Sequence, residues 1–203
     1  MLDTILLLAG EAERPVLAGM LRYAAPDLRV VEIASVIDLP VDLATARLVA
    51  FLFPEIVPAA VLAGLGHGAY NIHPGPPDYP GWAPVSFALY DGATRYGATL
   101  HEMAARADDG TICDVESFAI PPGADLARLS ELAYGASLRL FERWLESLAS
   151  PLGLPRLPLA WGGRRGTRQG FADLCRIPAD ASDEERLRRI RACGEAVKSC
   201  DDV

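Results

Sequence analysis

Residues 71–81 read Asn-Ile-His-Pro-Gly-Pro-Pro-Asp-Tyr-Pro-Gly. Four prolines and two glycines in these eleven residues remove backbone donors and interrupt regular structure, which predicts a loop of largely fixed shape. Asn71 and His73 precede all four prolines and are two residues apart, so they lie on the same side of the chain if the backbone is extended there. An amide donor beside a group that ionises near neutral pH is suited to stabilising charge on a substrate oxygen.

On the N-terminal side of this loop, short aliphatic runs alternate with helix-forming segments. The expected strands are residues 4–8, 28–33, 47–53 and 69–72, and the expected helices are residues 11–24 and 58–65. This alternation predicts an α/β fold, with an open, mostly parallel, Rossmann-like twisted sheet and helices on both faces. The loop at residues 71–81 then follows the carboxyl end of a central strand, where ligands bind in open α/β sheets.

On the C-terminal side, the pattern predicts a different set of elements. It predicts helices at residues 85–90, 125–148 and 182–196 and strands at residues 97–103 and 112–120. Residues 104–110, Ala-Ala-Arg-Ala-Asp-Asp-Gly, carry two adjacent carboxylates in a loop and are a second candidate site. Proline, glycine and arginine dominate residues 150–170.

Composition excludes several classes of function. The chain has 203 residues, of which 51% are hydrophobic, and a formal net charge of −8, with no basic stripe, so no nucleic-acid partner is expected. The apolar run at residues 1–9 contains Asp3 and lacks a basic leader, and no apolar run reaches membrane-spanning length. We therefore expect a cytoplasmic protein with no membrane partner. The four cysteines lack the spacing of a metal site, so no metal is expected.

Four motifs follow one another along the chain. They are Asn71-Ile72-His73-Pro74, Tyr79-Pro80-Gly81, Gly97-Ala98-Thr99-Leu100-His101 and Asp108-Asp109-Gly110. Their succession resembles the formyltransferases that use 10-formyltetrahydrofolate, a family with glycinamide ribonucleotide, methionyl-tRNA and nucleotide-linked amino-sugar formyltransferases and a formyltetrahydrofolate hydrolase. The resemblance implies the formyltransferase fold, with a catalytic domain at residues 1–150 and a C-terminal extension at residues 151–203 packed on the same domain.

The resemblance implies catalytic roles for Asn71, His73 and Asp108. In the family pattern Asp-x-Gly the aspartate stands two residues before the glycine, which selects Asp108 over Asp109. A substrate amine would attack the formyl carbon, and Asn71 and a protonated His73 would donate hydrogen bonds to the oxygen that becomes negative. Asp108 would raise the pKa of the His73 imidazole and help to relay a proton. For Asp108 and Asp109 a solvated loop remains the alternative.

The resemblance also implies where the co-substrate, 10-formyltetrahydrofolate, binds. The wall of the folate site falls on Phe53, Pro54, Glu55, Ile56 and Val57, and the segment around the pterin ring on Met103, Ala104, Ala105 and Ala107. Substrate-contacting or supporting positions fall on Pro76, Tyr79, Gly81, Thr99 and His101. A hydrogen-bonded core histidine is an equal alternative for His101.

Departures from the family patterns bear on the acceptor. After the first strand the chain has Ala9-Gly10-Glu11-Ala12-Glu13, whose carboxylates would repel the phosphate of glycinamide ribonucleotide. The loop after His73 is similar to that of sugar N-formyltransferases, so a nucleotide-linked amino sugar is one acceptor to expect. The arginines at 164, 165 and 168 either contact a pyrophosphate or form a solvated basic loop.

We therefore expect transfer of a formyl group from 10-formyltetrahydrofolate to a primary amine of a small acceptor. The alternatives are a non-catalytic folate- or metabolite-binding protein of this fold and a formyltetrahydrofolate hydrolase. The expected partners are a small-molecule amine and folate, and a homodimer is one open arrangement. Neither the acceptor's identity nor the oligomeric state follows from the sequence.

Overall fold

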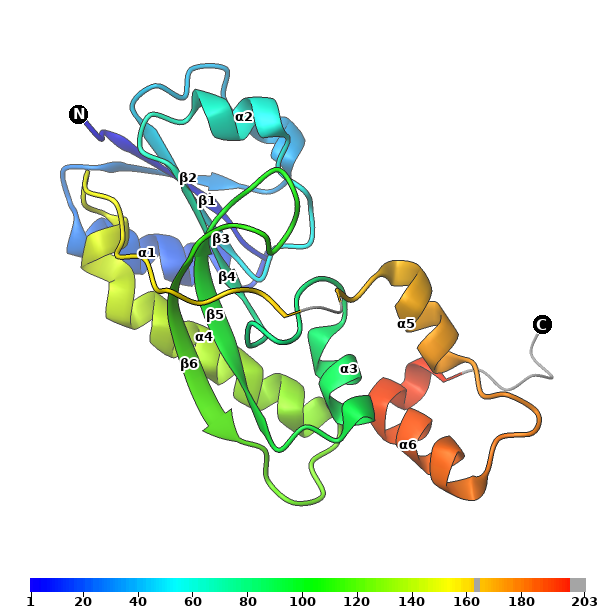
Figure 1. Cartoon of the computed structure of the whole chain (residues 1–203). Helices are drawn as coiled ribbons and strands as arrows, with labels where there is room; N and C mark the ends of the chain where they lie inside the picture. The colour runs from blue at the N-terminus through cyan, green and yellow to red at the C-terminus, as the bar shows by residue number, and fades with distance from the viewer. Residues whose placement is uncertain (163–164, 198–203) are drawn as a thin grey trace.

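A six-stranded sheet in the order β2-β1-β3-β4-β5-β6 forms the centre of the chain (Figure 1). The structure is a computed structural model that describes residues 1–162 and 165–197, so the expectation for Arg164 lies outside the described residues. The strands are β1 (Thr4–Leu8), β2 (Arg29–Ile33), β3 (Ala46–Phe51), β4 (Ala69–His73), β5 (Arg95–Glu102) and β6 (Ile112–Ala119). The first four strands are parallel, and β5 is antiparallel to both of its neighbours. The predicted open, mostly parallel sheet is confirmed.

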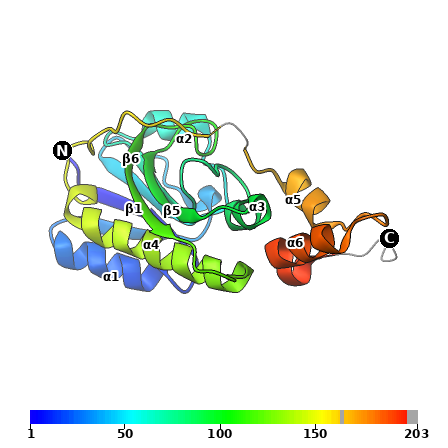
Figure 2. The same cartoon turned by 60° about the horizontal axis from the view of Figure 1, so that its bottom comes forward.

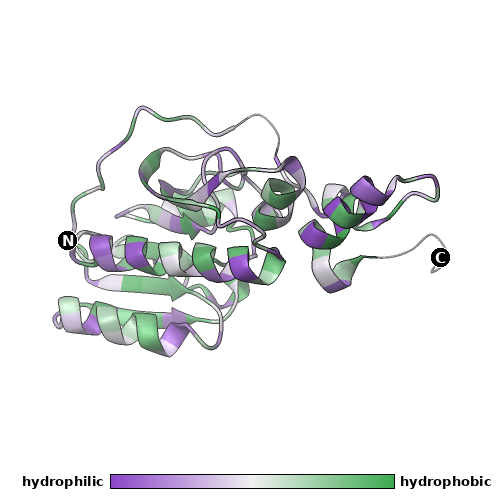
Figure 3. Cartoon of the chain, turned by 90° about the horizontal axis from the view of Figure 1, so that it is seen from below, coloured by the Kyte–Doolittle hydropathy of each residue, from purple (hydrophilic) through white to green (hydrophobic). Residues whose placement is uncertain are grey.

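Two amphipathic helices cover one face of the sheet. They are α1 (Arg14–Ala24) and α4 (Leu126–Leu148), and Figure 2 shows both on the same side. Both helices begin where the sequence favours a start: α1 has a proline in its first turn, and the Asp125 side chain caps α4 by accepting from the Arg128 amide. Along α4, hydrophobic and hydrophilic residues alternate in the way that an amphipathic helix requires (Figure 3). The apolar stripe of α4 packs against the sheet through Ala136, Leu140, Phe141 and Leu148.

The opposite face of the sheet is covered by α2 (Ala59–Gly64) and the short η1 (Val36–Asp38). The strand predicted at residues 47–53 ends at Phe51 instead, because Leu52 has a positive φ of 51° and leaves the extended conformation. The chain therefore turns away from the sheet at the carboxyl end of β3.

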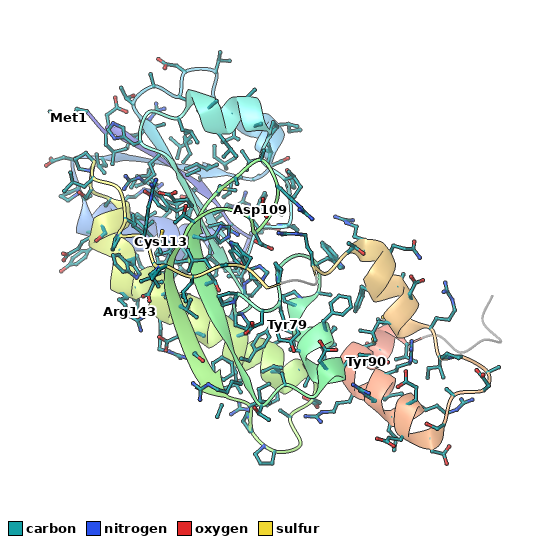
Figure 4. All side chains as sticks on the ribbon, in the orientation of Figure 1. Met1, Tyr79, Tyr90, Asp109, Cys113 and Arg143 are labelled. Carbon is teal, nitrogen blue, oxygen red and sulfur yellow. The ribbon has the colours of Figure 1, made fainter. Side chains whose placement is uncertain are left out.

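A third cluster of helices lies beyond the end of the sheet. It contains α3 (Pro84–Asp91), α5 (Arg168–Cys175), α6 (Asp183–Cys193) and η2 (Gly194–Ala196). The Tyr90 hydroxyl at the end of α3 donates to Glu185 of α6 at 2.8 Å, and Figure 4 shows Tyr90 where the two helices meet. The sequence pattern did not predict α5, because a helix of eight residues capped by Thr167 has too short a pattern to stand out from a glycine- and arginine-rich segment. The division at residue 150 stays a prediction.

Arg47 fixes the point where the chain leaves α4. Its guanidinium is 1% exposed and donates to the carbonyl oxygens of His67, Ser147, Leu148, Ser150 and Leu152. Three of these carbonyls belong to the C-terminal end of α4 and the turn after it, where a positive charge is favourable. The following segment, yellow in Figure 1, runs past β6 and continues toward α5. Its Leu157 amide donates to the Ile112 carbonyl of β6.

Within the described residues, no helix is both long enough and apolar enough to cross a membrane.

Candidate active site

Four polar side chains from three segments of the chain come together at one end of the sheet. Asn71 and His73 lie on β4, His101 lies on β5, and Asp108 lies on the loop between β5 and β6. Asn71 pairs with His101 across the antiparallel ladder, and a register irregularity at Leu100 and His101 interrupts the pairing of β5 with β6. Bulges of this kind are frequent beside active sites because they redirect a side chain.

Asp108 is the centre of this polar cluster. Its carboxylate is 6% exposed, lies 3.4 Å from the Nδ1 of His73 and 3.4 Å from the Nε2 of His101, and accepts from the Gly81 amide at 2.6 Å. Burial raises the pKa of Asp108, but the bonds and charges of the two histidines and the Gly81 amide outweigh it and lower the pKa to about 2. The carboxylate is therefore ionised at neutral pH.

His73 is held between a carboxylate and a backbone carbonyl. Its Nε2 donates to the Tyr79 carbonyl at 2.9 Å, because a carbonyl oxygen can only accept, and its Nδ1 faces Asp108. Burial lowers the pKa of His73 by more than Asp108 raises it. The expectation of a protonated His73 is therefore wrong: Asp108 does favour the charged form, but the loss of water around the ring dominates. The neutral ring keeps a lone pair on Nδ1.

The carboxamide of Asn71 is only half paired. Its Nδ2 lies 3.1 Å from the Nε2 of His101, whose Nδ1 donates to the Glu102 carbonyl at 2.7 Å. Its Oδ1 is buried and has no hydrogen-bond partner in the part of the chain that the structure describes. A buried unpaired oxygen typically costs about 1–3 kcal/mol, so this atom is suited to pairing with a ligand.

A cavity of about 570 Å³ opens in front of these groups. This volume is in the range of cofactor and small-molecule sites. The predicted residues that line it are Phe53, Pro54, Glu55, Ile56, Val57, Asn71, His73, Gly81, His101, Met103, Ala104, Ala107 and Asp108. Both predicted segments, residues 53–57 and residues 103–107, therefore contribute walls of one cavity.

Four predicted positions do not line this cavity: Pro76, Tyr79, Thr99 and Ala105. The Thr99 side chain is fully buried and donates to the Gly75 carbonyl at 2.7 Å, and the Tyr79 carbonyl accepts from His73. Pro76 is buried in the same loop, and Ala105 is exposed. In this structure Thr99 and Tyr79 fix the loop around His73.

Backbone strain is concentrated at the cavity. Among the described residues, the non-glycine residues with a positive φ are Leu52, Ala83 and Asp108, at 51°, 52° and 48°, and all three line the cavity. Such conformations cost about 1–3 kcal/mol each and cluster at functional sites. Glycine is required nearby as well: a Cβ on Gly75 would lie 2.7 Å from the His73 Nε2.

The segment after α4 supplies contacts that the sequence analysis did not find. We call Trp161, Gly162, Arg165 and Gly166 the strap, because they join the loop at residues 74–82 to the loop at residues 103–111. Gly162 and Gly166 donate to the carbonyls of Pro77 and Pro80, and Trp161 Nε1 donates to the Gly110 carbonyl at 2.8 Å. In Figure 4, Tyr79 and Asp109 mark these two loops.

Arg165 belongs to the strap rather than to a solvated basic loop. Its side chain is 18% exposed and donates to the carbonyls of Ala107 and Asp108 and to the Asp109 carboxylate. The interpretation of Arg165 as part of a solvated basic loop is therefore wrong, because contacts with residues more than 50 positions away in the chain bury its side chain. Arg168 instead stacks its guanidinium 4.3 Å from the centre of the Trp82 ring, at the cavity.

Residues 1–162 and 165–197 contain no group of three or more side chains placed to hold a metal ion.

Comparison with known proteins identifies relatives of this chain. The family model described as formyl transferase matches residues 33–136. The methionyl-tRNA formyltransferase of Listeria innocua is 39% identical over 80 residues, which are 39% of this chain and 24% of that relative. The match thus spans about a quarter of the length of this curated relative.

Solved structures share the fold at low sequence identity. A sugar N-formyltransferase from a Shewanella species has a TM-score of 0.78 and 17% identity, covering 94% of this chain and 87% of that one. An N-formyltransferase from Helicobacter canadensis, solved in complex with folinic acid and dTDP-3-aminofucose, has a TM-score of 0.71 and 14% identity, covering 95% and 81%. At these identities the likeness establishes the fold.

Proposed function

The chain belongs to the formyl transferase family, and from this premise we propose that it transfers a formyl group from 10-formyltetrahydrofolate to a primary amine of a small acceptor. The observation that carries the proposal is the polar cluster of Asn71, His73, His101 and Asp108 at the wall of the cavity, with one buried amide oxygen unpaired. In the reaction the amine nitrogen bonds to the formyl carbon, the bond from that carbon to the folate nitrogen breaks, and one proton passes from the amine to the departing nitrogen.

The walls of the cavity fit a folate. Leu52, Ile56, Val57 and Met103 give one part of it an apolar lining suited to a flat ring system. The chain segments at 53–57 and 103–107 bring backbone groups to the same part of the cavity, where they can pair with the polar edge of a pterin. Glu55, which anchors its segment through Ser35 Oγ and the Val36 amide, keeps this wall in place.

Asn71 can serve the reaction with either end of its carboxamide. In the observed orientation Oδ1 is free to accept a hydrogen bond from the attacking amine. A 180° rotation of the amide would instead direct Nδ2 at the formyl oxygen. A donor directed at a developing oxyanion contributes about 100-fold to 1000-fold in rate.

His73 and Asp108 form a proton-accepting pair. The neutral His73 has an Nδ1 lone pair, and a proton received there lies beside the ionised Asp108, which stabilises the imidazolium. The bond to the Tyr79 carbonyl fixes the ring orientation throughout. We assign His73 the role of general base and Asp108 the role of its charge partner.

The acceptor would enter from the side of the cavity formed by Trp82, Arg168 and Phe171, with Arg106 nearby on the lining. Two cations and two aromatic rings suit an acceptor that carries both a planar group and negative charge. A nucleotide-linked amino sugar has both, and the Helicobacter canadensis relative was solved with such a molecule.

The test is to incubate the protein with 10-formyltetrahydrofolate and a panel of amines, including nucleotide-linked amino sugars, and to measure tetrahydrofolate release. We expect release that depends on the amine and is strongly reduced in Asp108→Asn, whereas Asp109→Asn, whose side chain is 49% exposed and outside the cavity lining, keeps most of the activity. Release without any amine would indicate a hydrolase. Folate binding without release would indicate a binding protein.

A further inference from the structure

Trp161 does not line the cavity, yet its indole contacts both histidines of the polar cluster. The ring lies edge-on to His101, with the centroids 4.9 Å apart, and edge-on to His73, with the centroids 5.8 Å apart. Both imidazoles are almost completely buried, at 2% and 4% exposure, whereas Trp161 is partly exposed. The partly exposed indole therefore covers the two buried imidazoles without being part of the cavity lining.

The position of this indole is fixed from two directions. Its Nε1 donates to the Gly110 carbonyl at 2.8 Å, on the loop that carries Asp108. The next residue, Gly162, donates to the Pro77 carbonyl at 2.7 Å, on the loop that follows His73. A Cβ on Gly162 would lie 2.8 Å from the Cα of Asp78, so the strap lies directly against that loop. Trp161 thus joins the two loops whose side chains meet in the cluster.

We propose that Trp161 is a positioning residue that excludes water from His73 and His101 and holds both rings against Asp108. Its contribution to catalysis rests on the proposed function, because it acts through His73 rather than on the substrate. Its contribution to the environment of the histidines does not depend on any reaction.

Removal of the indole has a defined electrostatic consequence. The groups that face His73 are Asp108 on its loop, His101 on β5, Arg165 on the strap and the Tyr79 carbonyl. None of these is removed by a substitution at residue 161. Burial is the largest influence on His73 and lowers its pKa, so water admitted at the indole position would raise that pKa toward the usual value of about 6.5.

The experiment is an NMR titration of the histidine Cε1–H resonances in the wild type, Trp161→Phe and Trp161→Ala. The chain has three histidines, and His67→Gln and His101→Gln variants assign them. We expect the His73 midpoint to rise in Trp161→Ala and to stay near the wild-type value in Trp161→Phe, because phenylalanine keeps an aromatic ring edge at the imidazoles. The resonance of His67, which lies outside the cavity lining, is the internal reference for the comparison.

Activity gives a second, separable readout. In Trp161→Ala we expect kcat to fall about 100-fold, because a small misplacement of catalytic groups can cost that much in rate. We also expect the acid limb of the pH–rate profile to move to higher pH. Trp161→Phe should restore the position of the acid limb. Trp161→Ser, which also leaves space for water, takes the place of the alanine variant if that protein does not fold.

A His73 midpoint unchanged in Trp161→Ala, or in Trp161→Ser where it replaces it, would overturn the proposal. An equal rise in Trp161→Phe would also overturn it, because the effect would then not come from the ring. The titration needs no turnover, so a wild type without transferase activity would refute the proposed function and leave the assignment of Trp161 to be decided by NMR alone.

Discussion

Two buried charged side chains lie at different parts of this molecule, and their surroundings are opposites. Arg47 is 1% exposed and donates to five backbone carbonyls, so its guanidinium is well paired. Asp108 is 6% exposed and lies between two histidines, next to an amide whose oxygen has no partner among the described residues. Arg47 is not on the cavity lining, and Asp108 is.

This difference in pairing distinguishes a charged residue that stabilises the fold from one that is placed to take part in a reaction. A buried charge costs several kcal/mol unless it is well paired, and the carbonyls at the end of α4 supply that pairing for Arg47. In the cluster around Asp108 one buried atom, Asn71 Oδ1, has no partner among the described residues, and Asp108 itself has a strained positive φ. An incompletely paired cluster that faces a cavity can gain hydrogen bonds from a ligand, whereas a saturated one cannot.

The largest expected effect is on turnover at the incompletely paired cluster. In His73→Gln we expect kcat to fall about 100-fold to 10,000-fold, because glutamine cannot accept a proton near neutral pH. Steady-state release of tetrahydrofolate at saturating amine measures the loss. His67→Gln is the matched control, and it should keep wild-type turnover because His67 lies outside the cavity lining. Equal losses of kcat in His73→Gln and His67→Gln would show that the loss does not come from the polar cluster.

At the saturated site the expected effect is on stability instead. Arg47→Met keeps a long side chain but leaves the carbonyls without a donor, so we expect the free energy of unfolding to fall by about 3–5 kcal/mol. Urea denaturation followed by circular dichroism measures the change. In folded protein kcat should stay within about twofold of the wild type.

The control for this substitution is Arg95→Met, at the exposed start of β5. Its side chain makes one bond to the Ser117 hydroxyl, so the expected change is within about 0.5 kcal/mol. If Arg95→Met destabilised the protein as much as Arg47→Met does, the five carbonyl bonds would not be what distinguishes Arg47.

The pH dependence of turnover should reflect the state of His73. Its pKa is lowered by burial, so the ring stays neutral and able to accept a proton to a pH below its usual value of 6.5. We expect kcat/KM to rise with pH through an acid limb whose midpoint lies below 6.5. A midpoint above 6.5 would show that Asp108 outweighs burial, contrary to this account.

A smaller effect is expected on acid stability. Because the folded pKa of Asp108 is about 2 and the usual value is 3.8, the unfolded state binds more protons between these values. The contribution of Asp108 is therefore present above pH 3.8 and is lost as the pH falls toward 2. Acid unfolding of the wild type and Asp108→Asn should show that the variant loses less stability between pH 3.8 and 2. Equal losses of stability in the two proteins would show that the pKa of Asp108 is not lowered in the folded state.

The sequence predicted those parts of the structure that depend on local patterns. Alternating strands and helices indicated the open sheet, and Asn71 and His73 stand at the carboxyl end of β4 as their spacing in a strand required. The expectation that His73 is protonated was wrong. A motif indicates the nearby carboxylate, which favours the charged ring, but it does not indicate the burial that opposes it. Trp161 and Arg165 were missed because their contacts lie 51 to 58 positions away in the chain.

If the incompletely paired cluster directs a formyl group to an amine, a labelled formyl carbon must appear on the acceptor. The most direct measurement uses 10-formyltetrahydrofolate with a ¹³C-labelled formyl carbon and an amine acceptor from the panel, in the wild type and in Asn71→Ala. We predict that ¹³C NMR finds the label as an N-formyl group on the acceptor, at a rate about 100-fold to 1000-fold lower in Asn71→Ala. Label that appears only as formate, or on the acceptor at the same rate in both proteins, would contradict the account.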